Sequence, residues 1–303
     1  MSATIFKQAA IRPLTGTRIL SLALNLPGPA ALMRCQQMGA RCVKLESPAG
    51  DPMQIYSPAA YTALHKGIQI TKADLKSANG QKALHRELVN ANVLLTSFRP
   101  SALITLGLTW KALHQQYPQL SQVAIVGSPG PRAEEPGHDL TYMAENGLLT
   151  GLDLPATLYA DMGGSLMASE AVLRAALHRH MDGKTEHSGI YLEVALSNAA
   201  SYLALPRGLG LTTPGAGIGG GHAGYQIYPC KNGRVAVAAL EPHFAARLCT
   251  AAGLVNTSES PANMHLPTTR QAIAAWLLGK SRAQLDKLAM DKDIPLHTME
   301  RKP

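Results

Sequence analysis

The strongest constraint on the fold of this chain is an alternation of short apolar runs with helical patterns through its first half. The runs are rich in Val, Ile and Leu, which is typical of buried strands. Parallel strands need long, usually helical connections, so this alternation predicts a parallel sheet flanked by helices, a Rossmann-like α/β layer. The expected strands cover 17–24, 41–46, 92–98 and 121–127, and the expected helices cover 28–40, 79–91 and 109–117.

A further helix and strand extend this layer. After Gly163 a helical pattern runs to about His180, and a strand at 190–196 leads into a helix at 198–205. Because these elements continue the same alternation, we predict one large Rossmann-like domain over residues 1–204.

A second, smaller domain is expected after a break in the pattern. The stretch 205–224 is rich in Gly and Pro without periodicity, which is typical of a linker. Its glycines match the letter of G-x-G-x-x-G, but a buried strand does not precede them, which argues against nucleotide binding there. Beyond it, Asn232-Gly233 between two alternating runs predicts a hairpin, and three helical patterns follow. We therefore predict a small α+β domain over 225–303.

Composition narrows the class of protein. Apolar residues make up 46% of the chain and charged residues 16%, and the apolar runs are shorter than the roughly 18 residues of a membrane span. The N-terminus lacks the apolar core of a secretory signal, and the four cysteines form no C-x-x-C pair. We expect a cytoplasmic protein with reduced thiols, no metal site and no membrane partner.

The net charge of +8 predicts an anionic partner. The basic residues are scattered, only 5% of the residues are aromatic, and nucleic-acid-binding motifs are missing from the sequence. A small phosphorylated molecule is therefore favoured over nucleic acid.

Three polar residues stand at expected helix starts. Asp161 in "YADMGGS" precedes Gly163 and the long helical pattern, which is typical of an N-cap. A carboxylate at a helix N-terminus also keeps its charge, so it can serve as a base or a nucleophile. His138 follows a Pro-Gly turn, and Glu241 ends an apolar run ahead of Pro242. For each residue a structural and a chemical role both stay open at this point.

Several segments together resemble CoA-transferase family III, the CaiB/BaiF family, and within it the 2-methylacyl-CoA racemases. They occur in the family's order between about Pro13 and Thr298, and the resemblance implies the family's α/β fold with a large and a small domain. The segments are "PLTGTRILSLALNLPGPAALMRCQQMGARCVKLESPAGDP", "ADLKSANGQKALHRELVNANVLLTSFRPSALITLGL", "PGHDLTYMAENGLL", "YADMGGSLMASEAVLRAALHRH" and "YQIYPCKNGRVAVAALEPHF".

The resemblance implies an acyl-CoA enzyme that has a coenzyme A thioester as its substrate and carries no prosthetic group. Asp161 matches the position that family transferases use as nucleophile and family racemases use in proton transfer. His138 matches the racemase histidine, and Glu241 matches its acidic partner on the small domain of the neighbouring subunit. These three are the expected catalytic residues. Backbone N–H groups of Met162 and Gly163 are expected to stabilise the oxyanion.

The resemblance also implies where coenzyme A binds. Basic side chains there are expected to hold the phosphates, and Arg99 in "SFRP" matches an Arg-Pro motif of the family. Backbone N–H groups from Gly28 to Ala30 at a helix start would add to this site, although an ordinary strand-to-helix turn explains the same segment. The expected binding residues are Pro27, Gly28, Pro29, Lys44, His65, Lys66 and Arg99.

Departures from the family pattern leave three functions open. The loop "IVGSPGP" is shorter than in the family, the connection from His138 to Asp161 is tighter, and the C-terminal return segment is expected to be truncated. The most favoured function is racemisation or epimerisation at C2 of a 2-methylacyl-CoA, because pure transferases generally lack the histidine. The alternatives are CoA transfer to a carboxylate with Asp161 as nucleophile, and CoA-thioester binding without catalysis. The resemblance implies an interlaced homodimer in each case.

Overall fold

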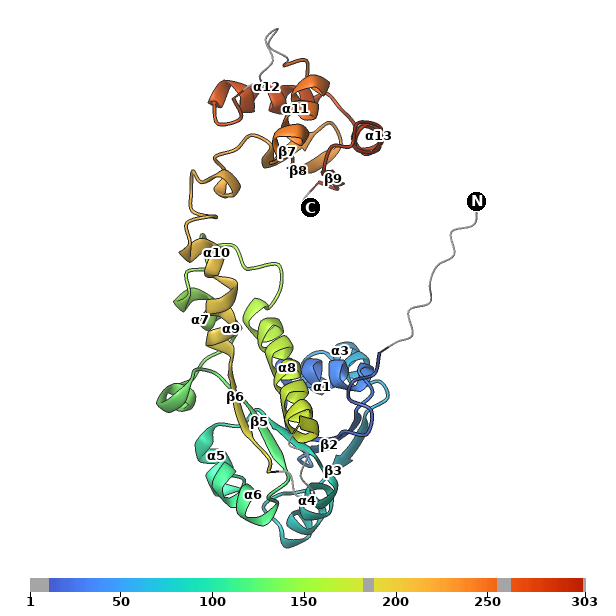
Figure 1. Cartoon of the computed structure of the whole chain (residues 1–303), viewed down its shortest axis with the longest axis vertical. Coiled ribbons are helices and arrows are strands. Elements are labelled where there is room, and N and C mark those ends of the chain that lie inside the picture. The colour runs from blue at the N-terminus through green and yellow to red at the C-terminus, as the bar shows by residue number, and fades with distance from the viewer. Residues whose placement is uncertain (1–10, 182–187, 255–262, 302–303) are drawn as a thin grey trace, which may run out of the picture. The chain divides into compact units, whose positions relative to one another are not determined.

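The computed structural model describes residues 11–181, 188–254 and 263–301, which form two compact units. The larger unit ends at Ala204 and the smaller one begins at Leu205. Figure 1 traces the chain through both units, and each is described by itself below.

The larger unit is built on a six-stranded parallel sheet in the order β3-β2-β1-β4-β5-β6. The order reverses between β1 and β4, as in doubly wound α/β folds, where ligands bind at the carboxyl ends of the strands beside the reversal. The strands are β1 (Arg18–Ser21), β2 (Arg41–Glu46), β3 (Gln69–Lys72), β4 (Val93–Thr96), β5 (Ser121–Val126) and β6 (Tyr191–Ala195).

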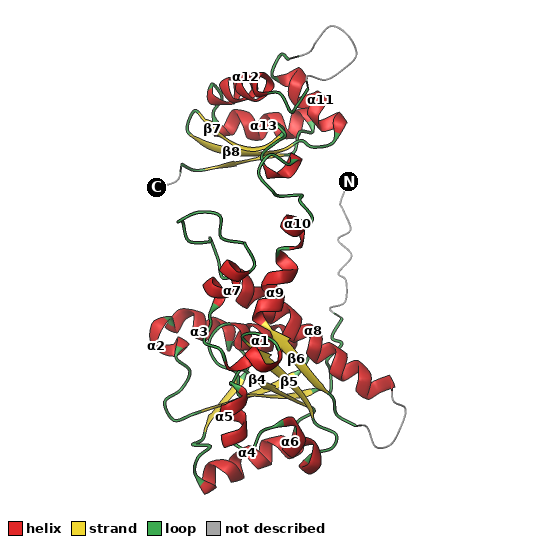
Figure 2. Cartoon of the chain, turned by 90° about the vertical axis from the view of Figure 1, so that its left-hand side faces the viewer, coloured by secondary structure: helices red, strands yellow, loops and turns green. Residues whose placement is uncertain are grey.

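Helices cover both faces of this sheet (Figure 2). Because side chains alternate along a strand, Ile19 of β1 faces one helical layer and Leu20 faces the other. One layer contains α1 (Pro27–Gln37) and α8 (Tyr159–Met181). The other contains α4 (Ala78–Asn90), α5 (Pro100–Thr105) and α6 (Trp110–Gln116). The remaining helices of this unit are α2 (Met53–Tyr56), α3 (Pro58–Leu64), the 3₁₀ helix η1 (Gly130–Glu134), α7 (Asp139–Glu145) and α9 (Leu196–Leu203).

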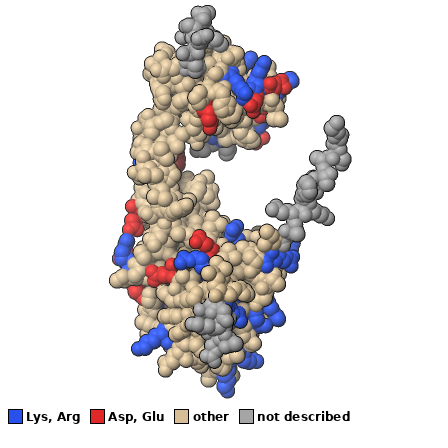
Figure 3. Space-filling model, viewed as in Figure 1, with Lys and Arg blue, Asp and Glu red and all other residues tan. Residues whose placement is uncertain are grey.

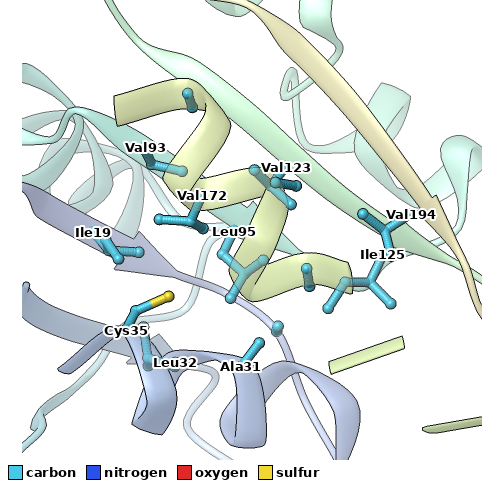
Figure 4. Close-up of a cluster of buried hydrophobic side chains, with 14 of the residues drawn as sticks. Ile19, Ala31, Leu32, Cys35, Val93, Leu95, Val123, Ile125, Val172 and Val194 are labelled. Carbon is cyan, nitrogen blue, oxygen red and sulfur yellow. The ribbon is translucent and has the colours of Figure 1, made fainter. Parts of the chain in front are cut away.

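The long helix α8 lies against the sheet through small side chains. Its buried face is mostly Ala, Gly and Ser, and Val172 packs among Val93, Leu95 and Val123 of the sheet (Figure 4). A side chain at Gly164 would collide with Leu196 of α9, because its Cβ would lie 2.2 Å from the leucine Cδ2. These small residues let α8 approach its neighbours closely.

The smaller unit is a three-stranded antiparallel sheet packed with helices. The hairpin of β7 (Tyr225–Cys230) and β8 (Gly233–Ala238) is extended by β9 (Leu296–Met299). Its helices are α10 (Leu205–Gly208), the 3₁₀ helix η2 (Gly217–Gly219), α11 (Pro242–Ala251), α12 (Pro267–Leu278) and α13 (Arg282–Lys292). In the described ranges, every helix is too short or too polar to cross a bilayer.

The predicted fold class is confirmed, and three local differences have physical causes. The two strands that the sequence pattern missed, β3 and β9, are short edge strands of four residues. The third difference concerns the long helix, which begins at Tyr159 rather than after Gly163. Gly163 and Gly164 are therefore inside the helix, where they allow close packing against α9. Asp161 lies in the first turn of the helix instead of before its start.

Candidate active site

A cavity of about 340 Å³ opens at the point where the strand order reverses. Its walls come from the loops that follow β1, β4 and β5 and from the starts of α7 and α8. The residues that line it include Asn25, Pro27, Arg99, Gly127, Gly137, His138, Tyr142 and Asp161. The location is the one that parallel α/β sheets use for ligands.

Asp161 is half-buried in the first turn of α8, on the wall of this cavity. Its backbone N–H donates a hydrogen bond of 3.0 Å to Oδ1 of Asp139, which is only 4% exposed. Burial and, to a smaller extent, the charge of Asp139 raise the pKa of the Asp161 carboxyl, His138 opposes them, and the resulting pKa is about 6. Asp161 therefore changes its protonation close to neutral pH.

His138 is the N-cap residue of α7 and lines the same cavity, where it is exposed. Its backbone N–H donates to Oγ1 of Thr141 at 3.0 Å, which fixes the start of the helix. The next residue, Asp139, receives the N–H of Asp161, so one short segment connects the two helix starts. The structure thus brings the imidazole and the Asp161 carboxylate to one cavity.

The expected oxyanion donors are not available. Because α8 begins at Tyr159, the N–H of Met162 donates to the carbonyl oxygen of Leu158 at 3.0 Å, inside the helix. Gly163 lies one residue further into the helix, beyond the first turn that leaves N–H groups free. The prediction for Met162 and Gly163 fails because the helix starts earlier than the glycines indicated.

Glu241 belongs to the smaller unit. It is exposed and occupies the N-cap position of α11, where its side chain makes no capping hydrogen bond. Its carboxylate is therefore not used to hold its own helix.

Arg99 lines the cavity at the end of the loop after β4, as the N-cap residue of α5. Its side chain is exposed and has no ion-pair partner within residues 11–181, 188–254 and 263–301. Lys66 is also exposed, just after α3. Both cations are open to an anionic ligand.

Lys44 and His65 are instead internal. The ammonium of Lys44, fully buried, lies 2.5 Å from Oδ2 of Asp51, 3.2 Å from Oε1 of Glu46 and 2.9 Å from Nε2 of His65. Burial and the charge of Lys44 lower the pKa of His65, which favours a neutral imidazole. Since its neighbours already surround the ammonium, the geometry gives Lys44 and His65 a structural role in place of the expected phosphate contact.

This cluster also has the distances of a metal site, because Glu46, Asp51 and His65 can each direct a ligand atom to a common point. The Lys44 ammonium contacts all three, so it supplies the positive charge that a metal ion would bring. Asp51 connects the cluster to the cavity, since its Oδ1 accepts the N–H of Asn25 at 3.1 Å. Asn25 has a φ of 62°, a left-handed conformation that this bond helps to hold.

The start of α1 offers fewer anion donors than expected. Pro27 and Pro29 have no N–H, and the N–H of Ala30 donates to the carbonyl oxygen of Leu26 at 3.0 Å. Gly28 is buried, and a Cβ there would lie 2.3 Å from Cβ of Ala23 in the segment after β1. Of these residues, Pro27 lines the cavity.

Two further residues of the site, Asp139 and Tyr142, are not among the residues expected from the sequence, although both follow His138 in "HDLTY". Asp139 comes directly after the histidine, and Tyr142 comes about one helical turn later, so both lie beside it at the start of α7.

The comparisons with known proteins agree with this fold. The model of CoA-transferase family III matches residues 14–301. The chain belongs to CoA-transferase family III. This confirms the resemblance found in the sequence.

Relatives of this family III chain include both transferases and racemases. It is 31% identical over 210 residues to cinnamoyl-CoA:phenyllactate CoA-transferase of Clostridium sporogenes, which covers 62% of this chain and 50% of that enzyme. It is 29% identical over 292 residues to alpha-methylacyl-CoA racemase of Mus musculus, which covers 89% of this chain and 73% of that one. The chain thus spans about half the length of the first of these relatives.

Two solved structures share the fold. A hypothetical protein from Mycobacterium tuberculosis superposes with a TM-score of 0.81 at 22% identity, covering 95% of this chain and 84% of the other. A CaiB/BaiF family protein from Brucella suis superposes with a TM-score of 0.76 at 24% identity, covering 94% and 83%. At these identities, the two similarities show that the fold is shared.

Replacement of Asp51 with Ala should destabilise this family III chain by about 3–5 kcal/mol, because it leaves the buried Lys44 ammonium without its nearest partner. Chemical denaturation measures the free energy of unfolding. Lys66→Ala, an exposed lysine nearby, is the control and should change it by less than about 0.5 kcal/mol. Equal losses in both variants would contradict the structural role of the cluster.

Replacement of Asp139 with Asn should lower the pKa of Asp161 from about 6, because it removes a like charge but keeps an oxygen that accepts the Asp161 N–H. Burial remains, so only part of the shift should be lost. Carboxyl NMR of labelled aspartate measures the titration, with Asp161→Asn to assign the signal. Asp153→Asn, in an exposed loop, is the control.

The same substitution has a consequence for stability. The folded-state pKa of Asp161 lies above the ordinary value of 3.8, so its ionisation costs stability as the pH rises from about 4 to 6. The Asp139→Asn protein should lose less stability over that interval. An Asp161 pKa that stays at about 6 in this variant would show that burial alone sets it.

Proposed function

We propose that this protein acts on acyl-CoA thioesters, with Asp161 and His138 as the groups that react with the substrate. The observation that carries the proposal is their presence in one cavity, where the Asp161 carboxyl has a pKa of about 6. A group with that pKa is ionised at neutral pH and still basic enough to take a proton from carbon. The cavity, at about 340 Å³, has room for the acyl thioester end of the substrate.

The favoured reaction is inversion at C2 of a 2-methylacyl-CoA. One of the two groups removes the C2 proton, the electron pair moves into the thioester to form a planar enolate, and the other group returns a proton to the opposite face. Each turnover exchanges which group is protonated, so atoms and charge balance. His138 and Asp161 approach the cavity from different helices, which supports two-sided proton transfer.

CoA transfer is the second candidate, and the similarity to a transferase favours it. The Asp161 carboxylate would attack the thioester carbonyl and expel CoA thiolate, which gives a mixed anhydride. The thiolate would then attack the aspartyl carbonyl and release the first carboxylate product. The resulting aspartyl-CoA thioester would pass CoA to an acceptor carboxylate by the reverse steps. This route needs Asp161 but does not need His138.

For coenzyme A itself, we propose Arg99 and Lys66 as the phosphate-binding cations. Both are exposed, and Arg99 is on the cavity wall beside Pro27. A guanidinium free of ion pairs in the described chain is well suited to bind phosphate in a bidentate way.

Two assays on (S)-2-methylbutanoyl-CoA test the reaction. Incubation in D₂O should place deuterium at C2 and produce the R epimer, and His138→Ala should slow this by about 10²–10⁴-fold. Asp161→Ala should slow it comparably, whereas Asp153→Ala should leave it unchanged. Formation of a hydroxamate at Asp161 with hydroxylamine, retained in His138→Ala, would show CoA transfer instead. CoA binding without either product would leave a binding protein.

We further propose that the protein is a homodimer of the interlaced kind that the resemblance implies. Large apolar side chains are exposed on α8, on α9 and in the segment before α8: Leu152, Leu154, Leu158, Met162, Leu166 and Tyr202. In Figure 3 the surface over α9 is almost free of charged side chains. An exposed apolar area of this kind is typical of a protein interface, and a second copy of the chain is its proposed occupant. Glu241 would then act on His138 of a neighbouring subunit.

Light scattering should give twice the mass of one chain. Leu154→Glu combined with Leu166→Glu should shift the protein towards the monomer, because it places charge in a buried apolar contact. Val89→Glu, an exposed apolar residue of α4 on the other side of the sheet, is the control. A wild-type protein that is monomeric at all concentrations would exclude the dimer.

A further inference from the structure

Tyr142, a buried residue, presents its hydroxyl at the cavity wall. Its side chain is 6% exposed, projects from α7 and lines the cavity together with His138 and Asp161. The hydroxyl lies against two glycines that also line the cavity, Gly127 and Gly137. A Cβ at either glycine would come within 2.6 Å of the phenol oxygen, so the missing side chains are what makes room for it.

This hydroxyl has no hydrogen-bond partner in the part of the chain that the structure describes. The hydroxyl of a largely buried tyrosine normally finds one. The buried hydroxyl of Tyr228 in the smaller unit behaves in the ordinary way, since it donates to the carbonyl oxygen of Ala223 at 2.7 Å. The Tyr142 hydroxyl is therefore free to form a hydrogen bond with a group that enters the cavity.

The charge around Tyr142 favours a donor role. Burial raises the pKa of its phenol, the nearby charge of Asp161 raises it further, and Arg99 opposes them. The hydroxyl accordingly keeps its proton at neutral pH. It can therefore donate a hydrogen bond, and an oxygen in the cavity that gains negative charge during the reaction would be stabilised most by that bond.

We infer that the Tyr142 hydroxyl donates a hydrogen bond to the thioester carbonyl oxygen of the substrate and stabilises the negative charge that forms there. The inference rests on the proposed function. It fits both candidate reactions, because the enolate of racemisation and the tetrahedral intermediate of CoA transfer carry their charge on the same oxygen.

The backbone N–H groups near the start of α8 do not supply this hydrogen bond. The N–H of Met162 bonds within the helix, and the N–H of Asp161 is taken by the Asp139 carboxylate. A side-chain donor from α7 replaces these groups, and it lies one turn after His138 on the same helix. Its ring is buried, so little reorganisation is needed when the substrate binds.

Infrared difference spectra can test the hydrogen bond without turnover. The probe is 2,2-dimethylpropanoyl-CoA labelled with ¹³C at the carbonyl, which has no C2 proton to exchange. Bound to the wild-type protein, its carbonyl stretch should move to lower frequency than in water-free solvent, and Tyr142→Phe should lose most of that shift. Tyr228→Phe is the matched control, because it also removes the hydroxyl of a buried tyrosine but lies outside the cavity.

Kinetics give a second readout. Tyr142→Phe should lower kcat by about 10²-fold while KM changes little, because the bond strengthens in the transition state. Thermal melting of the variant checks that it is folded. A carbonyl shift that survives in Tyr142→Phe would overturn the inference and leave the proposed function intact. A wild-type protein that binds no acyl-CoA would overturn both.

Discussion

Two adjacent parallel strands, β1 and β4, send the chain to opposite halves of the sheet, and the candidate site follows from this reversal. The loops that leave their carboxyl ends cannot cover one another, so a crevice stays open between them. Arg99 reaches it from the loop after β4, and Pro27 from the start of α1. The helices α7 and α8 then close its walls with His138, Tyr142 and Asp161.

The polar groups around this crevice support one another. Asp139 accepts the N–H of Asp161 and places a negative charge beside its carboxyl, which together with burial brings the pKa of Asp161 to about 6. On the other side, the buried cluster of Lys44 and Asp51 holds the backbone of Asn25 at the cavity edge. Neither Asp139 nor Asp51 is proposed to react, yet Asp139 influences the position and the ionisation of Asp161, and Asp51 fixes the backbone at the cavity edge.

Sequence patterns anticipated the large elements well because burial acts on them directly. The strand at Arg41–Glu46 was predicted to the residue, and five of its six residues are buried. The roles of single polar residues were harder to predict. Lys44 carries the positive charge that binds phosphate and lies in a segment that resembles a CoA-binding sequence, but three buried partners surround it. Its role depends on Asp51 and His65, which the chain brings near only by folding.

The sequence alone determined the parallel α/β layer, the second small α+β unit and the membership in CoA-transferase family III, because hydrophobic periodicity and ordered motifs are properties of the chain itself. Only the tertiary structure decided which polar side chains share a cavity. It placed His138 with Asp161, exposed Arg99, buried Lys44 and left the Tyr142 hydroxyl unpaired within the described chain. The physical reason is that a polar group's chemistry depends on its solvent exposure and on its partners, and the packing of distant segments sets both.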